Sequence, residues 1–139
     1  MIEISTDSER LDIDLIHRFL SDESYWASGI PRDLVERSID NSLCFGAFER
    51  SAQVGFARVV TDYATFGYLA DVFVLPSHRG RGIGRQILQA VKDHPDLQRL
   101  RRWHLVTSDA HALYAELGFH EIESPQRHME IAVKNAYVS

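Results

Sequence analysis

Glycines and arginines alternate in the stretch SHRGRGIG, which runs from Ser77 to Gly84. Gly80, Gly82 and Gly84 stand at alternate positions, and glycines crowded in this way are typical of a backbone that must go where a side chain would obstruct. The arginines between them favour a negatively charged ligand. An apolar strand pattern precedes the stretch and a helical pattern follows it, so free N–H groups at a helix start would face that anion. The stretch therefore predicts a phosphate site.

Spacing excludes two common nucleotide-binding loops. A Walker loop ends in Gly-Lys-Ser/Thr, and this loop contains no lysine. The Rossmann pattern G-x-G-x-x-G would need its third glycine where Arg85 or Ile87 stands. It also needs a parallel βαβ unit, whereas the strands before this loop are expected to be antiparallel. The pattern that fits is R-x-x-G-x-G, from Arg79 to Gly84.

The elements that position this loop follow from hydrophobic periodicity. Helical spacing predicts helices over about 11–21, around Leu34 to Ile39, from near Gly84 to His94, and over 108–118. Aromatic and β-branched residues predict strands over 2–5, 43–49, 53–63, 66–75, 101–107, 119–123 and 128–133. Short links between the second, third and fourth strands favour antiparallel hairpins. We expect an α/β (α+β) fold: a single mixed, mostly antiparallel sheet flanked by four helices, in one domain over 1–139.

Composition limits the classes of function. Apolar residues make up 45% of the chain, enough for a core, and a net charge of −5 argues against a nucleic-acid partner. The seven histidines have no metal-site spacing, and with one cysteine we expect no metal. No apolar run reaches the ~18 residues of a membrane helix, and the first residues show no secretory pattern, so we expect a cytoplasmic protein. Cys44 is interpreted as a core residue, with a reactive thiol as the alternative.

The loop, its flanking strand and helix, and the downstream run Tyr114-Ala115-Glu116-Leu117-Gly118-Phe119 resemble the GNAT superfamily of acyl-CoA-dependent N-acyltransferases. The resemblance covers essentially the whole chain. It implies the GNAT fold, with the sheet splayed between its fourth and fifth strands near Val74. It also implies an acetyltransferase that uses acetyl-CoA as its cofactor and acts on a small-molecule or side-chain primary amine, by direct attack in a ternary complex. Homodimers are common among such proteins.

The resemblance assigns the coenzyme A site to the loop and the splayed strands. Backbone amides from Arg79 to Arg85 would bind the pyrophosphate, and an N–H near Phe73 or Val74 would polarise the thioester carbonyl. Ser108 borders the same gap from the other side. The cofactor-binding residues implied in this way are Phe73, Val74, Arg79, Gly80, Arg81, Gly82, Ile83, Gly84, Arg85 and Ser108.

Two side chains are candidates for catalysis. The resemblance implies that Tyr114 donates a proton to the departing thiolate, whereas its place beside a core stripe is equally that of a boundary aromatic. Strand alternation puts Asp71 on the face of Leu69 and Phe73, where partial desolvation would raise its pKa toward that of a useful base. The alternatives for Asp71 are a substrate-ammonium contact and a structural ion pair with Arg58.

The loop between the first two helices contains Tyr25 and Trp26, and a pair of large aromatic residues in a polar loop is expected to cover something. It is either a lid on the core or an aromatic wall for the acceptor, which Tyr68 would join. Two other functions stay open: a regulatory module that binds acyl-CoA without turnover, and a transferase of the same fold that uses a different acyl-CoA.

Overall fold

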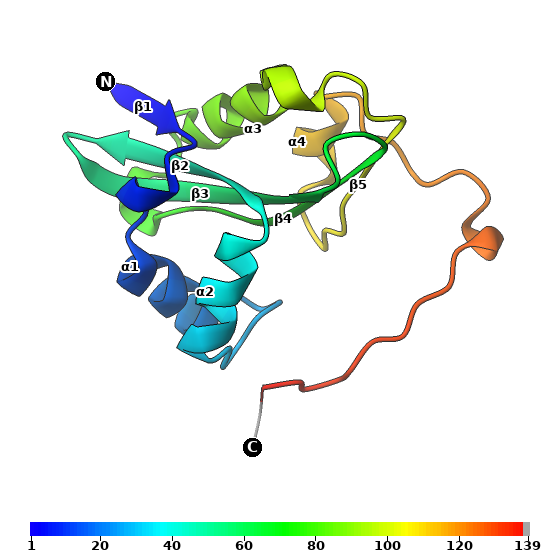
Figure 1. Ribbon diagram of the computed structural model, residues 1–139, viewed down its shortest axis with the longest axis horizontal. Helices are drawn as coiled ribbons and strands as arrows, with labels where there is room; N and C mark the ends of the chain where they lie inside the picture. The colour runs from blue at the N-terminus through cyan, green and yellow to red at the C-terminus, as the bar shows by residue number, and fades with distance from the viewer. Residues whose placement is uncertain (138–139) are drawn as a thin grey trace.

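The computed structural model describes residues 1–137, which fold around one sheet with helices on both faces (Figure 1). The strands follow one another in sequence order across this sheet. They are β1 (Ile2–Ser5), β2 (Leu43–Glu49), β3 (Ala52–Thr61), β4 (Phe66–Val74) and β5 (Arg102–His104). The first four pair antiparallel, and β5 joins β4 in parallel. The predicted mixed, mostly antiparallel sheet is confirmed.

Four α-helices pack on this sheet within the described residues, as predicted. They are α1 (Ile13–Arg18), α2 (Arg32–Asp40), α3 (Ile83–Asp93) and α4 (His111–Ala115). A π-helical turn, Phe19–Glu23, continues α1. α1 and α2 cover one face of the sheet, and α3 and α4 lie on the other (Figure 1). None of these helices within residues 1–137 has the length and apolarity needed to cross a bilayer.

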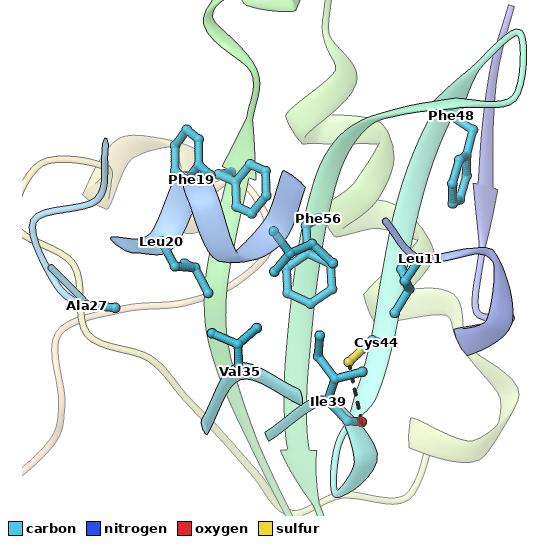
Figure 2. Close-up of a cluster of buried hydrophobic side chains, with 11 residues drawn as sticks. Leu11, Phe19, Leu20, Ala27, Val35, Ile39, Cys44, Phe48 and Phe56 are labelled. Atoms are coloured by element: carbon cyan, nitrogen blue, oxygen red, sulfur yellow. Dashed lines mark hydrogen bonds between the residues drawn. The ribbon is translucent and has the colours of Figure 1, made fainter. Parts of the chain in front are cut away.

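Two hydrophobic clusters hold the layers together, one on each face of the sheet. Figure 2 shows the cluster beneath α1 and α2, in which Phe19, Leu20, Val35 and Phe56 meet. The ring of Phe19 also stacks on that of Phe73, with centroids 4.0 Å apart. Because burying each of these side chains stabilises the fold by about 1.5–3 kcal/mol, α1 and its π-helical turn are fixed firmly against β4.

β4 contains a bulge at Asp71, which the sequence did not predict. The register with β3 shifts between Phe56 and Arg58, so β4 has one extra residue there. Asp71 adopts a left-handed φ of +54°. Strict alternation placed Leu69 and Phe73 on one face, but Leu69 packs with the α3 cluster and Phe73 with the α1–α2 cluster. That expectation was wrong because one inserted residue reverses the phase of the strand.

The predicted splay between β4 and β5 is confirmed, but it begins earlier than expected. The two strands pair only from Phe66, opposite Arg102, to Tyr68, opposite His104. Beyond Tyr68 they separate, so the gap between them opens along most of β4 rather than at Val74. Since the strands are parallel, the gap widens toward their carboxyl ends, where the glycine loop begins.

β5 and α4 are both shorter than the predicted ranges 101–107 and 108–118. The side chain of Thr107 accepts hydrogen bonds from the N–H groups of Asp109, at 3.4 Å, and Ala110, at 3.1 Å. This turn ends the extended segment and delays the helix. The oxygen that satisfies these two amides belongs to the Thr107 side chain, which competes locally with continued helix or strand.

The two strands predicted over 119–123 and 128–133 do not form. Residues 119–137, which we call the C-terminal arm, run away from the sheet without forming a strand or an α-helix, and they contain a 3₁₀ turn at Pro125–Arg127 and a further turn over 134–137 (Figure 1). An alternating pattern becomes a strand only where an edge is available for pairing. Within residues 1–137, the arm pairs with no strand edge. The predicted domain of 1–139 reaches two residues beyond those described and stays a prediction.

Candidate functional site

The glycine loop (residues 79–84) joins the end of β4 to α3, and two of its glycines have left-handed backbones. Gly80 has φ +80° and Gly82 has φ +77°, which residues with a Cβ rarely adopt. A Cβ built on either residue would meet no atom within 4 Å. The glycines are therefore required by the path of the chain rather than by crowding, and they leave open space in front of the loop.

The first turn of α3 presents unused N–H groups to this space. Gly82 is the N-cap residue and offers no side chain to the helix. Among residues 1–137, the amides of Ile83, Gly84 and Arg85 donate no hydrogen bond; the first that does is Gln86, to the Gly82 carbonyl at 3.1 Å. Buried apolar side chains on the opposite side of α3 hold the helix in place. A helix start of this kind attracts an anion through its amides and its dipole.

The amide of Arg79 differs from the others in the predicted run of phosphate-binding amides. It donates to the Pro76 carbonyl at 3.4 Å, in a 3₁₀ turn at Pro76–His78. The Arg79 side chain is also engaged, since its Nε donates to the Val74 carbonyl at 3.1 Å. Arg79 therefore stabilises the junction between β4 and the loop.

Two further arginines of the site form ion pairs with carboxylates. Arg81 donates to Glu49 at 2.5 Å, and Arg85 makes two hydrogen bonds to Glu116, at 3.1 and 3.0 Å. Hydrogen bonds from Arg81, and then from His78, lower the pKa of Glu49 to about 2. Because Glu49 and Glu116 largely neutralise the positive charge of these two arginines, the free amides are the main anion-binding groups of the loop.

Main-chain direction in β4 identifies the donor that faces the gap. The N–H of Leu75 donates to the Val54 carbonyl on β3 at 2.9 Å. Since successive peptide groups of a strand point to opposite sides, the N–H of Val74 points away from β3 and toward β5. Phe73 faces its β3 partner Phe56. Of the two predicted donors, Val74 is the one aimed into the gap.

The loop before α2 is shaped by a serine turn. The hydroxyl of Ser24 donates to the Leu20 carbonyl at 2.6 Å and accepts from the Ala27 amide at 3.1 Å. Ala27 is buried, so it anchors the loop to the core. Tyr25 and Trp26 are left 62% and 42% exposed at the loop tip, with their rings in an edge-to-face contact 5.0 Å apart.

These two aromatic residues contact both walls of the splayed gap. The indole N–H of Trp26 donates to Oδ1 of Asp71 on β4 at 2.8 Å. The hydroxyl of Tyr25 accepts from the amide of Ser108, which follows β5, at 3.2 Å. The pair therefore forms a roof over the gap. Ser108 takes part through its backbone rather than its side chain, a role that residue type alone cannot reveal.

Asp71 forms the predicted ion pair with Arg58. The Arg58 Nε donates to Oδ2 of Asp71 at 2.8 Å, and a second guanidinium nitrogen donates to the Ser42 hydroxyl at 3.1 Å. Both carboxylate oxygens of Asp71 thus accept a hydrogen bond, one from Arg58 and one from Trp26. These two donors hold both oxygens of the Asp71 carboxylate in fixed positions.

Tyr114 lies half-buried on α4, close to the roof. Burial raises the pKa of its hydroxyl above the ordinary value, with smaller contributions from Tyr25 and Asp109. Its ring meets Phe119 edge to face at 6.0 Å. It also lines an open groove of about 970 Å³ between β5 and α4. The hydroxyl therefore stays protonated well above neutral pH, as a general acid requires.

Tyr68 and Cys44 lie apart from this arrangement. Tyr68 stacks on His104, with centroids 5.7 Å apart, where β4 and β5 separate. Among residues 1–137 it makes no hydrogen bond or ring contact with Tyr25 or Trp26. Cys44 is buried, and burial raises the pKa of its thiol to about 12, so it behaves as the predicted core residue and not as a nucleophile.

Comparison with known proteins assigns the chain to a class. A family model described as an acetyltransferase (GNAT) domain matches residues 40–121. A protein of Gibberella zeae assigned as an acetyltransferase is 35% identical over 133 residues, which span 81% of this chain and 75% of that protein. The chain belongs to the GNAT acetyltransferase family, and the predicted resemblance is confirmed. It is an acyl-CoA-dependent acetyltransferase.

Solved structures of other proteins share this fold. A GNAT-family protein from Xanthomonas campestris pv. campestris, also assigned as an acetyltransferase, is 56% identical and has a TM-score of 0.98 over 100% of this chain and 98% of its own. A Clostridium acetobutylicum protein described as an acetyltransferase with acetyl-CoA is 18% identical, with a TM-score of 0.72 over 95% of this chain and 96% of its own. The second likeness concerns the fold alone.

Proposed function

We propose that this enzyme transfers the acetyl group of acetyl-CoA to a primary amine by direct attack in a ternary complex. One observation carries the proposal. The free amides of α3 lie at the wide end of the gap between β4 and β5, and Tyr25 and Trp26 cover that gap. Anion binding and amine recognition would thus occur at two ends of one channel. A cytoplasmic location stays a prediction.

The loop fits the pyrophosphate of coenzyme A. The space in front of Gly80 and Gly82 is open, and a Cβ at either position would enter it. The amides of Gly80 to Arg85 would bind the phosphate oxygens, since none of them has a protein partner within residues 1–137. Acetyl-CoA, when bound, supplies an activated acetyl thioester, and the N–H of Val74 is the group placed to polarise its carbonyl.

Proton transfer follows from the change in bonding. A C–N bond forms and a C–S bond breaks, so the amine loses one proton to water and the departing sulfur needs one. Tyr114 is the proposed donor, because its raised pKa keeps the hydroxyl protonated at neutral pH. Cys44 has no role, and a Cys44→Ala variant is expected to keep its activity, as direct attack requires.

The acceptor would lie under the aromatic roof. Asp71 forms an ion pair with Arg58, and it is proposed to hold the Trp26 ring in place rather than to act as the base. The faces of Trp26 and Tyr25 suit a cationic or apolar acceptor. Tyr68 lies on β4 at the narrow end of the gap and would contact only an acceptor that reaches that far.

Two measurements test the proposal. Thermal unfolding with coenzyme A and a series of acyl-CoAs should show stabilisation, worth about 2.7 kcal/mol at a hundredfold excess over Kd. Thiol release is then followed with a panel of primary amines. No stabilisation by any of these ligands would overturn the proposal. Stabilisation without thiol release on any amine would favour a binding module, and a preference for longer chains would favour a different acyl donor.

A further inference from the structure

An arginine and a glutamate join the start of α3 to the end of α4, the helix that carries Tyr114. Arg85 lies in the first turn of α3, and Glu116 directly follows the last residue of α4. The guanidinium donates from Nε to one carboxylate oxygen at 3.1 Å and from a terminal nitrogen to the other at 3.0 Å. Within residues 1–137, no other hydrogen bond joins α3 to residues 108–118.

The place of each charge in its own helix indicates a role between the two helices. A cation in the first turn of a helix and an anion at its end are both disfavoured by the helix dipole. Neither Arg85 nor Glu116 is therefore explained by the stability of its own helix. Hydrogen bonds from Arg85 lower the pKa of the Glu116 carboxyl, so the pair is charged on both sides at neutral pH. The partner helix is what stabilises each charge.

α4 has few other anchors. It is five residues long, and none of its residues is fully buried. Its N-terminal side is held by the turn at Thr107 and by the hydrogen bond between the Ser108 amide and the Tyr25 hydroxyl. A helix this short is not stable by itself. Its C-terminal side therefore depends on the contact that Glu116 makes with α3.

The two ends of the proposed cofactor site must keep a fixed spacing. The pyrophosphate would bind free amides in the first turn of α3, among them the amide of Arg85 itself. The departing sulfur would lie near the hydroxyl of Tyr114. One covalent molecule spans both places, so a movement of α4 relative to α3 would separate the acid from the sulfur. A misplacement of about 1 Å can cost roughly 10²-fold in rate.

We propose that the Arg85–Glu116 pair fixes the position of Tyr114 relative to the phosphate-binding amides of α3. Glu116 is then a positioning residue, which acts through α4 and not through contact with acetyl-CoA. The amide of Arg85 serves the phosphate, and its side chain serves the pair. A bidentate pair of this kind restricts both distance and orientation, unlike an ordinary surface ion pair. The inference rests on the proposed function, because it concerns the placement of the proposed general acid.

Glu116→Gln tests the pair, since it keeps the size of the side chain and removes its charge. We expect kcat to fall about tenfold, which is part of the contribution of a general acid. The Kd of coenzyme A should not rise, because the free amides remain and Arg85 regains an unmatched positive charge. Thiol release gives kcat, with the primary amine on which the wild type is fastest, and calorimetry gives Kd. An unchanged kcat, or an equal loss in kcat and in coenzyme A affinity, overturns the proposal.

Two further variants show whether the effect passes through Tyr114. Glu3→Gln breaks a matched bidentate pair with Arg10, at 2.8 and 3.1 Å, on β1 at the opposite edge of the sheet from β5. It should leave kcat unchanged, and a loss equal to that of Glu116→Gln would refute a specific role. In a Tyr114→Phe background, Glu116→Gln should cause no further loss of kcat. The same loss in both backgrounds would show that Glu116 does not act through Tyr114.

Hydrogen exchange separates the failure of this inference from the failure of the proposed function, because it needs no turnover. The amides of Leu117 and Phe119 donate to the Tyr114 carbonyl at 3.0 and 3.2 Å. They should exchange severalfold faster in Glu116→Gln than in the wild type or in Glu3→Gln. Unchanged exchange in this segment contradicts the pair as an anchor of α4, even in an active enzyme. A wild type that neither binds coenzyme A nor releases thiol overturns the proposed function instead.

Discussion

The indole of Trp26 donates a hydrogen bond to Asp71 at 2.8 Å, across 45 positions of sequence. The bond ties the tip of the loop before α2 to the bulge in β4, so two irregular features of the backbone hold each other in place. Bulges frequently lie beside active sites because they re-aim a side chain. Here the bulge aims Asp71 at both Trp26 and Arg58.

Removing this bond should affect the acceptor more than the cofactor. Trp26→Phe keeps an aromatic ring but loses a hydrogen bond to a carboxylate, a bond typically worth about 1.5–3 kcal/mol. Because the ring is partly exposed, we expect the lower end, which is roughly a tenfold rise in the KM of the amine. The Kd of acetyl-CoA should not change. Steady-state kinetics and calorimetry measure the two quantities, and an equal effect on both would contradict the assigned role.

The glycine loop can be tested with a matched pair of variants. Gly82→Ala forces a Cβ onto a left-handed backbone, at a cost of about 1–2 kcal/mol in the free energy of unfolding, and places a methyl group in the space proposed for the pyrophosphate. Gly118→Ala imposes the same kind of backbone cost at φ +99°, also with no atom within 4 Å of the new Cβ. Both should lose similar stability, but only Gly82→Ala should bind coenzyme A more weakly.

A more severe change at the same position sharpens this test. Gly82→Glu adds a negative charge in front of the free α3 amides, so it should abolish coenzyme A binding through both bulk and repulsion. Circular dichroism checks that the variant is folded. A folded Gly82→Glu protein that binds coenzyme A with unchanged Kd would rule out the loop as the pyrophosphate site.

The role of Tyr114 predicts a pH profile. Burial raises its pKa above the ordinary value of a tyrosine, about 10, so the hydroxyl is protonated at neutral pH and loses its proton only as the pH rises through that elevated pKa. Wild-type kcat should fall in this alkaline range. Tyr114→Phe should lose about 10²-fold or more in kcat and lack the alkaline limb. Tyr63→Phe, in the exposed β3–β4 hairpin, serves as the control, and unchanged kinetics in Tyr114→Phe would disprove the assignment.

The pair of Glu49 and Arg81 predicts an acid-dependent stability. The folded-state pKa of Glu49 is lowered from 4.5 to about 2, so its stabilising contribution is complete above the unfolded pKa and is lost as the pH falls through about 2. The difference in unfolding free energy between wild type and Glu49→Gln should therefore shrink between about pH 4.5 and pH 2. Chemical denaturation at several pH values measures it. An Arg81→Gln background should remove most of this dependence, since Arg81 is the largest cause of the shift.

Local pattern was sufficient for much of the fold. The hairpin strands β2 and β3, the start of β4 and nearly the whole of α3 follow from periodicity, because burial on one or both faces is written into adjacent residues. Prediction from local pattern failed at Asp71, because a bulge is a property of the pairing between two strands. It failed again over 119–123 and 128–133, since an alternating segment becomes a strand only when it finds an edge.

The sequence by itself determined the glycine spacing at 79–84 and the family, because a loop that leads directly into a helix is a local structure. Only the tertiary structure decided that Trp26 meets Asp71 and that Tyr25 meets the amide of Ser108, 83 positions away. The same holds for the pairing of Asp71 with Arg58, which the sequence offered as one of three roles. Contacts between distant segments depend on how the layers pack, and no pattern within a single segment encodes them.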